Sequence, residues 1–105
     1  MLEDEMLKEP SREAIDKSTG PMLLEFGASW CGHCRKLKPG LALQLSAFPQ
    51  VRHVKVEDGP GQPLGRSFGV KLWPTLVLLR DGRVALIAVR PHSGEIRSCL
   101  EAITH

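Results

Sequence analysis

Apolar and polar residues follow each other along the chain in patterns that predict both strands and helices. Short apolar runs bounded by glycine, proline or serine are typical of buried strands. Apolar residues three or four positions apart indicate one face of a helix. Strands are expected at 22–27, 51–56, 75–79 and 83–89, and helices at 11–18, 36–48, 64–68 and 93–103. This order, a βαβ unit followed by a ββα unit, predicts an α/β fold with a central mixed sheet flanked by helices.

Local signals indicate where these elements begin and end. Ser11 and Ser93 are expected to cap the first and last helices. In the first helix, Ala14 and Ile15 are expected to face inward. The long second helix is expected to begin at the cysteines and to be kinked by Pro39. Asp81-Gly82 predicts a hairpin turn between the last two strands, because such turns need positive φ.

Composition excludes several classes of protein. The chain has 105 residues, of which 42% are hydrophobic and 25% charged, as expected for one globular domain over 1–105 with a loose segment at 1–10. A net charge of +2 gives no strong basic field for nucleic acid. No apolar run approaches the roughly 20 residues of a membrane span. We therefore expect a monomer with neither nucleic-acid nor membrane partners.

The N-terminus and the cysteine count indicate a compartment. Residues 1–8 are acidic and lack the basic and apolar regions of a signal peptide. Three cysteines are also too few for a small secreted scaffold held together by disulfides. We therefore expect a cytoplasmic protein.

Cys31 and Cys34 form a Cys-x-x-Cys pair, which is a candidate redox motif. The pair follows the strand expected at 22–27 and opens the next helix, so Cys31 would lie at a helix N-terminus. Free N–H groups and the helix dipole lower the pKa of a thiol there. Cys31 is therefore expected to attack a substrate disulfide, and Cys34 to resolve the mixed disulfide.

Half of a zinc site is the competing interpretation of the pair. A structural zinc ion needs four ligands, and the remaining candidate ligands are scattered along the chain at His53, His92, Cys99 and His105. We expect these histidines to be surface residues without chemistry, and Cys99 to be a packing residue on an apolar helical stripe. No metal or other cofactor is expected.

The residues around the pair resemble a known family. Glu25-Phe26-Gly27-Ala28-Ser29-Trp30-Cys31-Gly32-His33-Cys34, followed by Pro39, resembles the active-site block of the thioredoxin superfamily. The likeness continues through Trp73-Pro74-Thr75 and Asp81-Gly82. The Cys-Gly-His-Cys form is more similar to protein disulfide isomerase domains than to thioredoxin, which has proline in place of His33. The resemblance implies the thioredoxin fold and a protein-disulfide oxidoreductase with a reversible Cys31–Cys34 disulfide.

The resemblance also implies roles for residues around the pair. Glu25 matches the buried carboxylate that accepts or relays the Cys34 proton, and Lys55 matches the lysine beside that carboxylate. Gly32 and His33 would tune the redox pair, because an imidazole beside Cys31 stabilises the thiolate and raises the reduction potential above that of thioredoxin. Substrate contacts are implied for Trp30, Trp73, Pro74, Thr75 and Arg90, with Pro74 matching the cis-proline of the family.

Two residues depart from the family pattern. Arg90 stands where glycine is usual, and Trp73 is bulkier than the usual isoleucine.

The partners that the resemblance implies are protein disulfides or dithiols and an external electron donor, such as a thioredoxin reductase-type enzyme or glutathione. A peptide-binding, chaperone-type module with incidental redox activity is the alternative. The first strand of the family would fall at 1–8, where the sequence supports it poorly.

Overall fold

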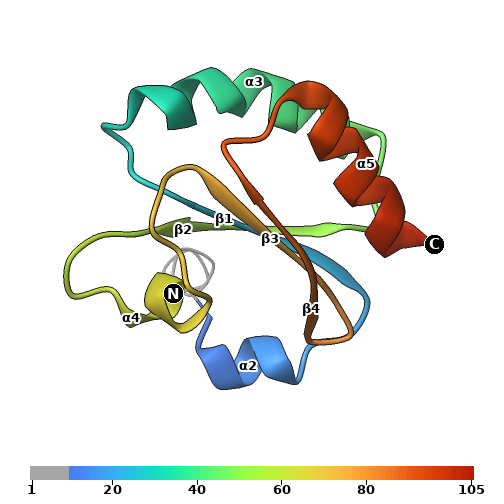
Figure 1. Cartoon of the computed structure of the whole chain (residues 1–105). Helices are drawn as coiled ribbons and strands as arrows, with labels where there is room; N and C mark the ends of the chain where they lie inside the picture. Colours follow the sequence, from blue (N-terminus) through green and yellow to red (C-terminus); the bar gives the residue numbers. More distant parts are fainter. Residues whose placement is uncertain (1–9) are drawn as a thin grey trace, which may run out of the picture.

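The elements follow in the order expected from the sequence. A computed structural model describes residues 10–105 (Figure 1). Its elements are α2 (Arg12–Asp16), β1 (Pro21–Gly27), α3 (Gly32–Ser46), β2 (Arg52–Glu57), α4 (Pro63–Ser67), β3 (Thr75–Arg80), β4 (Arg83–Val89) and α5 (Ser93–Thr104). The sheet order is β2-β1-β3-β4, with β1 and β2 parallel and the other neighbours antiparallel. The predicted mixed sheet is confirmed.

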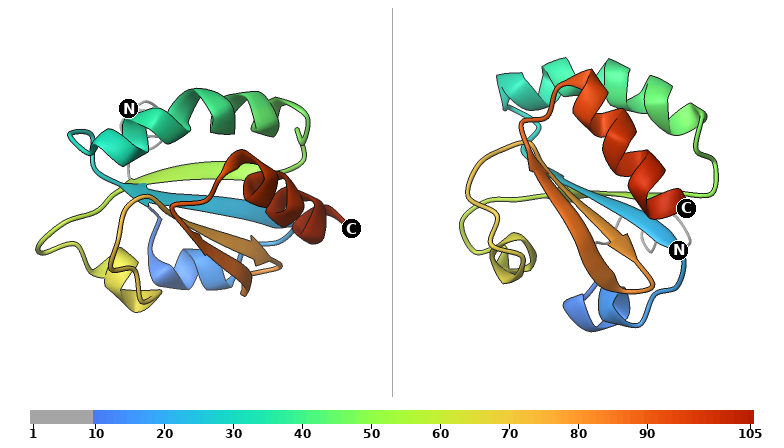
Figure 2. Two further views of the ribbon diagram at one scale, coloured as in Figure 1. Left: turned by 45° about the horizontal axis from the view of Figure 1, so that its top comes forward. Right: turned by 45° about the vertical axis from the view of Figure 1, so that its right-hand side comes forward.

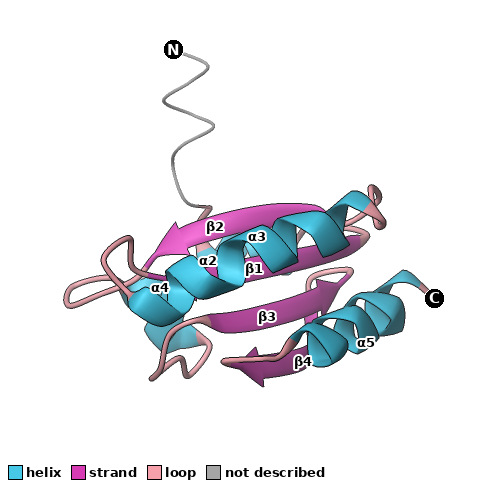
Figure 3. Cartoon of the chain, turned by 90° about the horizontal axis from the view of Figure 1, so that it is seen from above, coloured by secondary structure: helices cyan, strands magenta, loops and turns pink. Residues whose placement is uncertain are grey.

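Helices cover both faces of the sheet, and each face has its own apolar core. Helices α3 and α5 lie on one face, and α2 and α4 lie on the other (Figures 2 and 3). Because side chains alternate along a strand, β1 contributes to both cores. The core under α3 and α5 includes Leu23, Leu41, Leu76, Leu78, Ile96 and Leu100, and the core on the opposite face includes Ile15, Leu24, Phe26, Phe68, Val77 and Leu79.

The predicted hairpin turn between β3 and β4 is confirmed. Asp81 has φ of 53° and Gly82 has φ of 78°, as this turn requires. A Cβ atom on Gly82 would lie 2.1 Å from the backbone oxygen of Asp16, so the turn also packs closely against α2. The Asp81 carboxylate accepts a hydrogen bond from the backbone N–H of Gly20 at 2.8 Å.

Some details differ from the sequence-based expectations. Helix α5 is capped by His92, whose side chain accepts the Glu95 N–H while the Glu95 carboxylate accepts the His92 N–H; the prediction of Ser93 as the cap was wrong. Ser11 does cap α2, but Ala14 is exposed and only Ile15 is buried. Helix α3 begins at Gly32 and continues on both sides of Pro39.

Strand β4 lies at one edge of the sheet and is more exposed than its apolar sequence suggests. Val84, Leu86, Ile87 and Val89 are each 38–50% exposed.

The strand of the family expected at 1–8 lies outside the described residues, as does all of the segment 1–10 except Pro10. Within residues 10–105, no helix is long and apolar enough to cross a membrane.

Candidate active site

The cysteine pair lies where the carboxyl end of β1 meets the N-terminus of α3. Cys31 is the N-cap residue of α3, and Cys34 lies in the first turn of that helix. The connecting loop is held from two sides: the Ser29 N–H donates to the Glu57 carboxylate at 3.0 Å, and Arg35 Nε donates to the Ser29 oxygen at 3.2 Å. Glu57 ends β2, which is parallel to β1, so both strands deliver residues to the same edge of the sheet.

Both thiols are nearly buried, but their surroundings favour different protonation states. Cys31 is 8% exposed and Cys34 is 6% exposed, so exposure hardly separates them. The pKa of Cys31 is lowered, chiefly by a hydrogen bond from the Cys34 thiol, with help from backbone N–H groups and the Arg90 charge. The pKa of Cys34 is raised, first by burial and then by that same hydrogen bond and the charges of Cys31 and Glu25. The site therefore favours a thiolate at Cys31 beside a thiol at Cys34.

These opposed pKa shifts predict selective alkylation. Near neutral pH, iodoacetamide is expected to modify Cys31 before Cys34 and Cys99, because the thiolate is the reactive form. Burial also raises the pKa of Cys99. As pH rises, the other two thiols ionise and the preference for Cys31 should narrow. Peptide mapping after brief labelling measures the order, and equal labelling of the three cysteines near neutral pH would contradict it.

Gly27 allows Cys34 to pack directly against β1. A Cβ atom at this position would lie 2.7 Å from Cys34 Sγ, closer than such atoms approach in proteins. Gly27→Ala is therefore expected to displace the Cys34 thiol, to slow disulfide reduction and to cost about 1–3 kcal/mol of stability. Urea unfolding and insulin-reduction assays measure both effects.

Gly40→Ala is the matched control for the Gly27 substitution. A Cβ atom on Gly40, in α3, would meet nothing within 4 Å. Alanine favours a helix over glycine by about 1 kcal/mol, so this variant should be at least as stable as the parent. Equal losses of stability in the two variants would show that Gly27 has no special role in packing.

Two tryptophans flank the pair. Trp30 is 69% exposed, and its ring meets that of Trp73 edge-on, with centroids 5.4 Å apart. Trp73 packs against the cysteines, and its Nε1–H donates to the Asp58 carboxylate at 2.8 Å. Trp30 therefore presents a large apolar surface beside the pair, while Asp58 fixes the orientation of Trp73.

Arg90 closes the loop that carries Pro74. The Trp73–Pro74 peptide bond is cis, as the family resemblance implies. The Arg90 N–H donates to the Pro74 oxygen and its Nε donates to the Trp73 oxygen, both at 2.8 Å. Arg90 has φ of 48°, a conformation that favours glycine, the residue usual here in the family. The arginine thus keeps the backbone shape and adds a charge at the rim.

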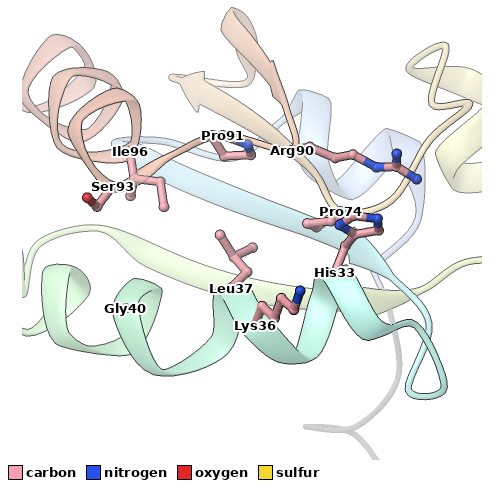
Figure 4. A pocket seen from close by; sticks show the side chains of 9 residues that line it. All are labelled: His33, Lys36, Leu37, Gly40, Pro74, Arg90, Pro91, Ser93 and Ile96. Atoms are coloured by element: carbon pink, nitrogen blue, oxygen red, sulfur yellow. The ribbon is translucent and has the colours of Figure 1, made fainter.

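A pocket of about 250 Å³ extends from this rim between α3 and the segment before α5. Figure 4 shows His33, Lys36 and Leu37 on α3 facing Pro74, Arg90 and Pro91 on the other wall. The pocket is lined by His33, Lys36, Leu37, Gly40, Pro74, Arg90, Pro91, Ser93 and Ile96, none of them acidic.

Thr75, the residue after Pro74, is buried. It is 1% exposed, and its hydroxyl donates to the Leu72 oxygen. The Thr75 side chain therefore supports the loop that carries Pro74.

The buried carboxylate below the pair has a partner that the sequence did not indicate. Glu25 is 4% exposed, and its Oε1 lies 2.8 Å from His53 Nε2. Lys55, the residue opposite Glu25 in the strand register, is exposed, and within residues 10–105 the Glu25 carboxylate is hydrogen-bonded to His53. His53 is a surface residue, as predicted, but the sequence did not indicate its contact with Glu25. Burial of Glu25, inferred from its apolar neighbours, is confirmed.

The remaining candidate metal ligands do not come together. His92 caps α5 and Cys99 packs partly against the core under α3 and α5. In the part of the chain that the structure describes, no three His, Cys, Asp or Glu residues are placed to hold a metal ion.

Comparisons with known proteins agree with this geometry. The family model described as Thioredoxin matches residues 5–102. The structure of thioredoxin 2 from Pseudomonas aeruginosa in its reduced form superposes with a TM-score of 0.81 at 50% identity, covering 93% of this chain and 92% of that one.

Curated proteins of two kinds match parts of the chain. Thioredoxin-2 of Pyricularia oryzae is 36% identical over 66 residues, which are 63% of this chain and 39% of that protein. Protein disulfide-isomerase A2 of Pongo abelii is 46% identical over 65 residues, which are 58% of this chain and 12% of that protein. The chain thus spans less than half the length of either relative. With the family model matching nearly the whole chain, it belongs to the thioredoxin family, and Cys31 and Cys34 have the spacing of a Cys-x-x-Cys motif.

Proposed function

We propose that the protein exchanges electrons between its cysteine pair and disulfides of other proteins. The Cys31 thiolate attacks one sulfur of the substrate disulfide, and the other substrate sulfur leaves as a thiolate that takes up a proton. Cys34 then loses its proton and attacks Cys31 Sγ, which releases the second substrate thiol and forms the Cys31–Cys34 disulfide. The substrate gains two electrons and the pair loses two. The observation that carries this proposal is the placement of the two thiols, with Cys31 as the N-cap of α3 and Cys34 packed beside it in the first turn. Their opposed pKa shifts support it.

An external thiol reductant must return two electrons for each new cycle. A thioredoxin reductase-type enzyme or glutathione would supply them, and no resident cofactor takes part in the exchange. We propose that this cycle takes place in the cytoplasm and that the protein works as a monomer. His33, beside Cys31, favours the reduced state by stabilising the thiolate, so the pair should be more oxidising than that of thioredoxin.

The rim of the site supports a role in substrate binding. Trp30 is exposed, Pro74 and Trp73 adjoin the cysteines, and Arg90 is held against the backbone of both. We propose that an extended segment of the substrate lies across Trp30 and Pro74. The basic pocket beyond them, with His33, Lys36 and Arg90, would favour acidic residues near the substrate cysteine.

Arg90→Gly tests both contributions of this residue. The Arg90 charge lowers the pKa of Cys31, so its removal should move the pH midpoint of Cys31 alkylation upward. Reduction of a disulfide peptide with flanking glutamates should slow more than reduction of the same peptide with glutamines. If the pH midpoint of Cys31 alkylation is unchanged and reduction of the two peptides slows equally, Arg90 contributes neither to the Cys31 pKa nor to substrate preference. Because glycine accepts positive φ, the fold should be retained.

The proposed activity is tested by insulin reduction with dithiothreitol as electron source. The parent chain should accelerate precipitation of the reduced insulin B chain, and the Cys34→Ser variant should accumulate a mixed disulfide through Cys31. If the parent gives no acceleration but still binds peptides, the alternative of a peptide-binding module would replace the proposal.

A further inference from the structure

The buried Glu25 carboxylate is in direct contact with a partly exposed side chain, that of His53. Glu25 lies on β1, on the same face as Leu23, below the helix that carries Cys34. The Glu25 side chain is 5% exposed, and the His53 side chain on the neighbouring strand is 36% exposed. The 2.8 Å contact between Oε1 and Nε2 therefore joins a buried acid to an imidazole that water can reach.

We infer that His53 is the group through which the proton of Cys34 leaves the site. The inference rests on the proposed function, because only the resolving step requires Cys34 to lose that proton. The proton passes from Cys34 Sγ to the Glu25 carboxylate, then to His53 Nε2, and the imidazolium releases a proton from Nδ1 to water. No electron moves in this relay. Loss of the Nδ1 proton leaves a neutral imidazole with its proton on Nε2, and proton exchange with water restores the tautomer with a free Nε2 before the next cycle.

Histidine suits this place for a chemical reason. Its unperturbed pKa is close to neutrality, so it can both accept and release a proton at working pH. Lysine at the same contact would hold its proton and act as a fixed charge. Two other ionisable groups lie near Glu25: Cys34, whose pKa the Glu25 charge raises, and Lys55, opposite Glu25 on β2. The neighbour on β3, Leu76, is apolar. His53 is thus the partly exposed group, in direct contact with Glu25, that can carry a proton.

The two chemical steps can be observed separately. When the reduced chain is mixed with excess 5,5′-dithiobis(2-nitrobenzoate), attack by Cys31 releases one coloured thiolate. Resolution by Cys34 then releases a second. A Cys99→Ala background removes the third thiol from the count. The first phase tests the proposed function through Cys31, and the second phase tests the relay through Cys34, so failure of one is distinguishable from failure of the other.

His53→Gln is the informative substitution, because glutamine keeps an N–H donor for Glu25 but cannot carry a proton. At pH 7 the second phase should slow about tenfold, less than the roughly 10²–10⁴-fold of direct general acid–base catalysis because His53 acts through Glu25, while the first phase keeps its rate. His105→Gln, the same change at an exposed C-terminal residue, should alter neither phase. In a Glu25→Gln background, His53→Gln should have no additional effect.

Chemical rescue separates proton transfer from a purely structural role. In His53→Ala, added imidazole should restore the second phase in proportion to its concentration, since the vacated position is open to solvent. Lys55→Gln should slow the second phase less than His53→Gln does. The inference is overturned if His53→Gln resolves as fast as the parent, if imidazole does not accelerate His53→Ala, or if the first phase slows equally with the second.

Discussion

Replacing Cys31 with serine is expected to lower the rate of insulin reduction by a factor on the order of 10³ or more, as when an essential nucleophile is removed. The serine hydroxyl does not ionise near neutral pH, so the position loses its thiolate. The site around Cys31 is arranged for that charge: the Cys34 thiol, backbone N–H groups and Arg90 all lower the Cys31 pKa. The dithiothreitol-coupled insulin assay measures the loss.

Two other cysteine variants serve as controls. Cys99 lies on α5, outside the pair, so Cys99→Ser should retain activity. Cys34→Ser should keep the first attack but stop at the mixed disulfide, which mass spectrometry detects. If Cys31→Ser retains turnover, Cys31 is not the nucleophile. If the cellular role persists without turnover, the chain acts as a peptide-binding module.

Replacing Phe26 with alanine is expected to destabilise the fold by about 3–5 kcal/mol. Phe26 is fully buried on β1, and its ring lies 5.9 Å from that of Phe68 near α4. The substitution removes apolar contact area and leaves a cavity between the sheet and α4. Because a domain has only about 5–15 kcal/mol of net stability, the loss should be evident in urea or thermal unfolding.

Leu43→Ala provides the control for this core substitution. Leu43 is 74% exposed on α3, and surface changes of this kind usually stay within about 0.5 kcal/mol. If Phe26→Ala costs no more than Leu43→Ala, the packing between β1 and α4 contributes little to stability.

The periodicity of apolar residues was enough to place the strands and helices. Each element packs an apolar face against one of two cores, so the spacing of its apolar residues follows its own period. The stripe on α3 predicted from Leu37, Leu41 and Leu45 packs under the helix as expected. The turn at Asp81-Gly82 was also predictable, since few residue pairs accept positive φ at both positions. The cap of α5 was not: Ser93 is a common cap residue, but the reciprocal bonds of His92 and Glu95 begin the helix one residue earlier.

The redox pair was predictable from its spacing, whereas its supporting residues depend on strand pairing. His53 reaches Glu25 because β1 and β2 pair in parallel with Leu23 opposite His53 and Glu25 opposite Lys55. The pattern of residues along the chain does not indicate this diagonal contact between neighbouring strands. Asp58 and Glu57 likewise reach Trp73 and Ser29 only after the sheet has formed.

Equilibration with mixtures of reduced and oxidised glutathione tests the central claim most directly. We predict that Cys31 and Cys34 oxidise together in one two-electron transition, with Cys99 remaining a thiol. We propose that the midpoint lies above the value of about −270 mV for thioredoxin, because an imidazole beside the Cys31 thiolate would stabilise the reduced form. The account would be contradicted if both cysteines stayed free throughout the titration, or if they formed only separate glutathione adducts.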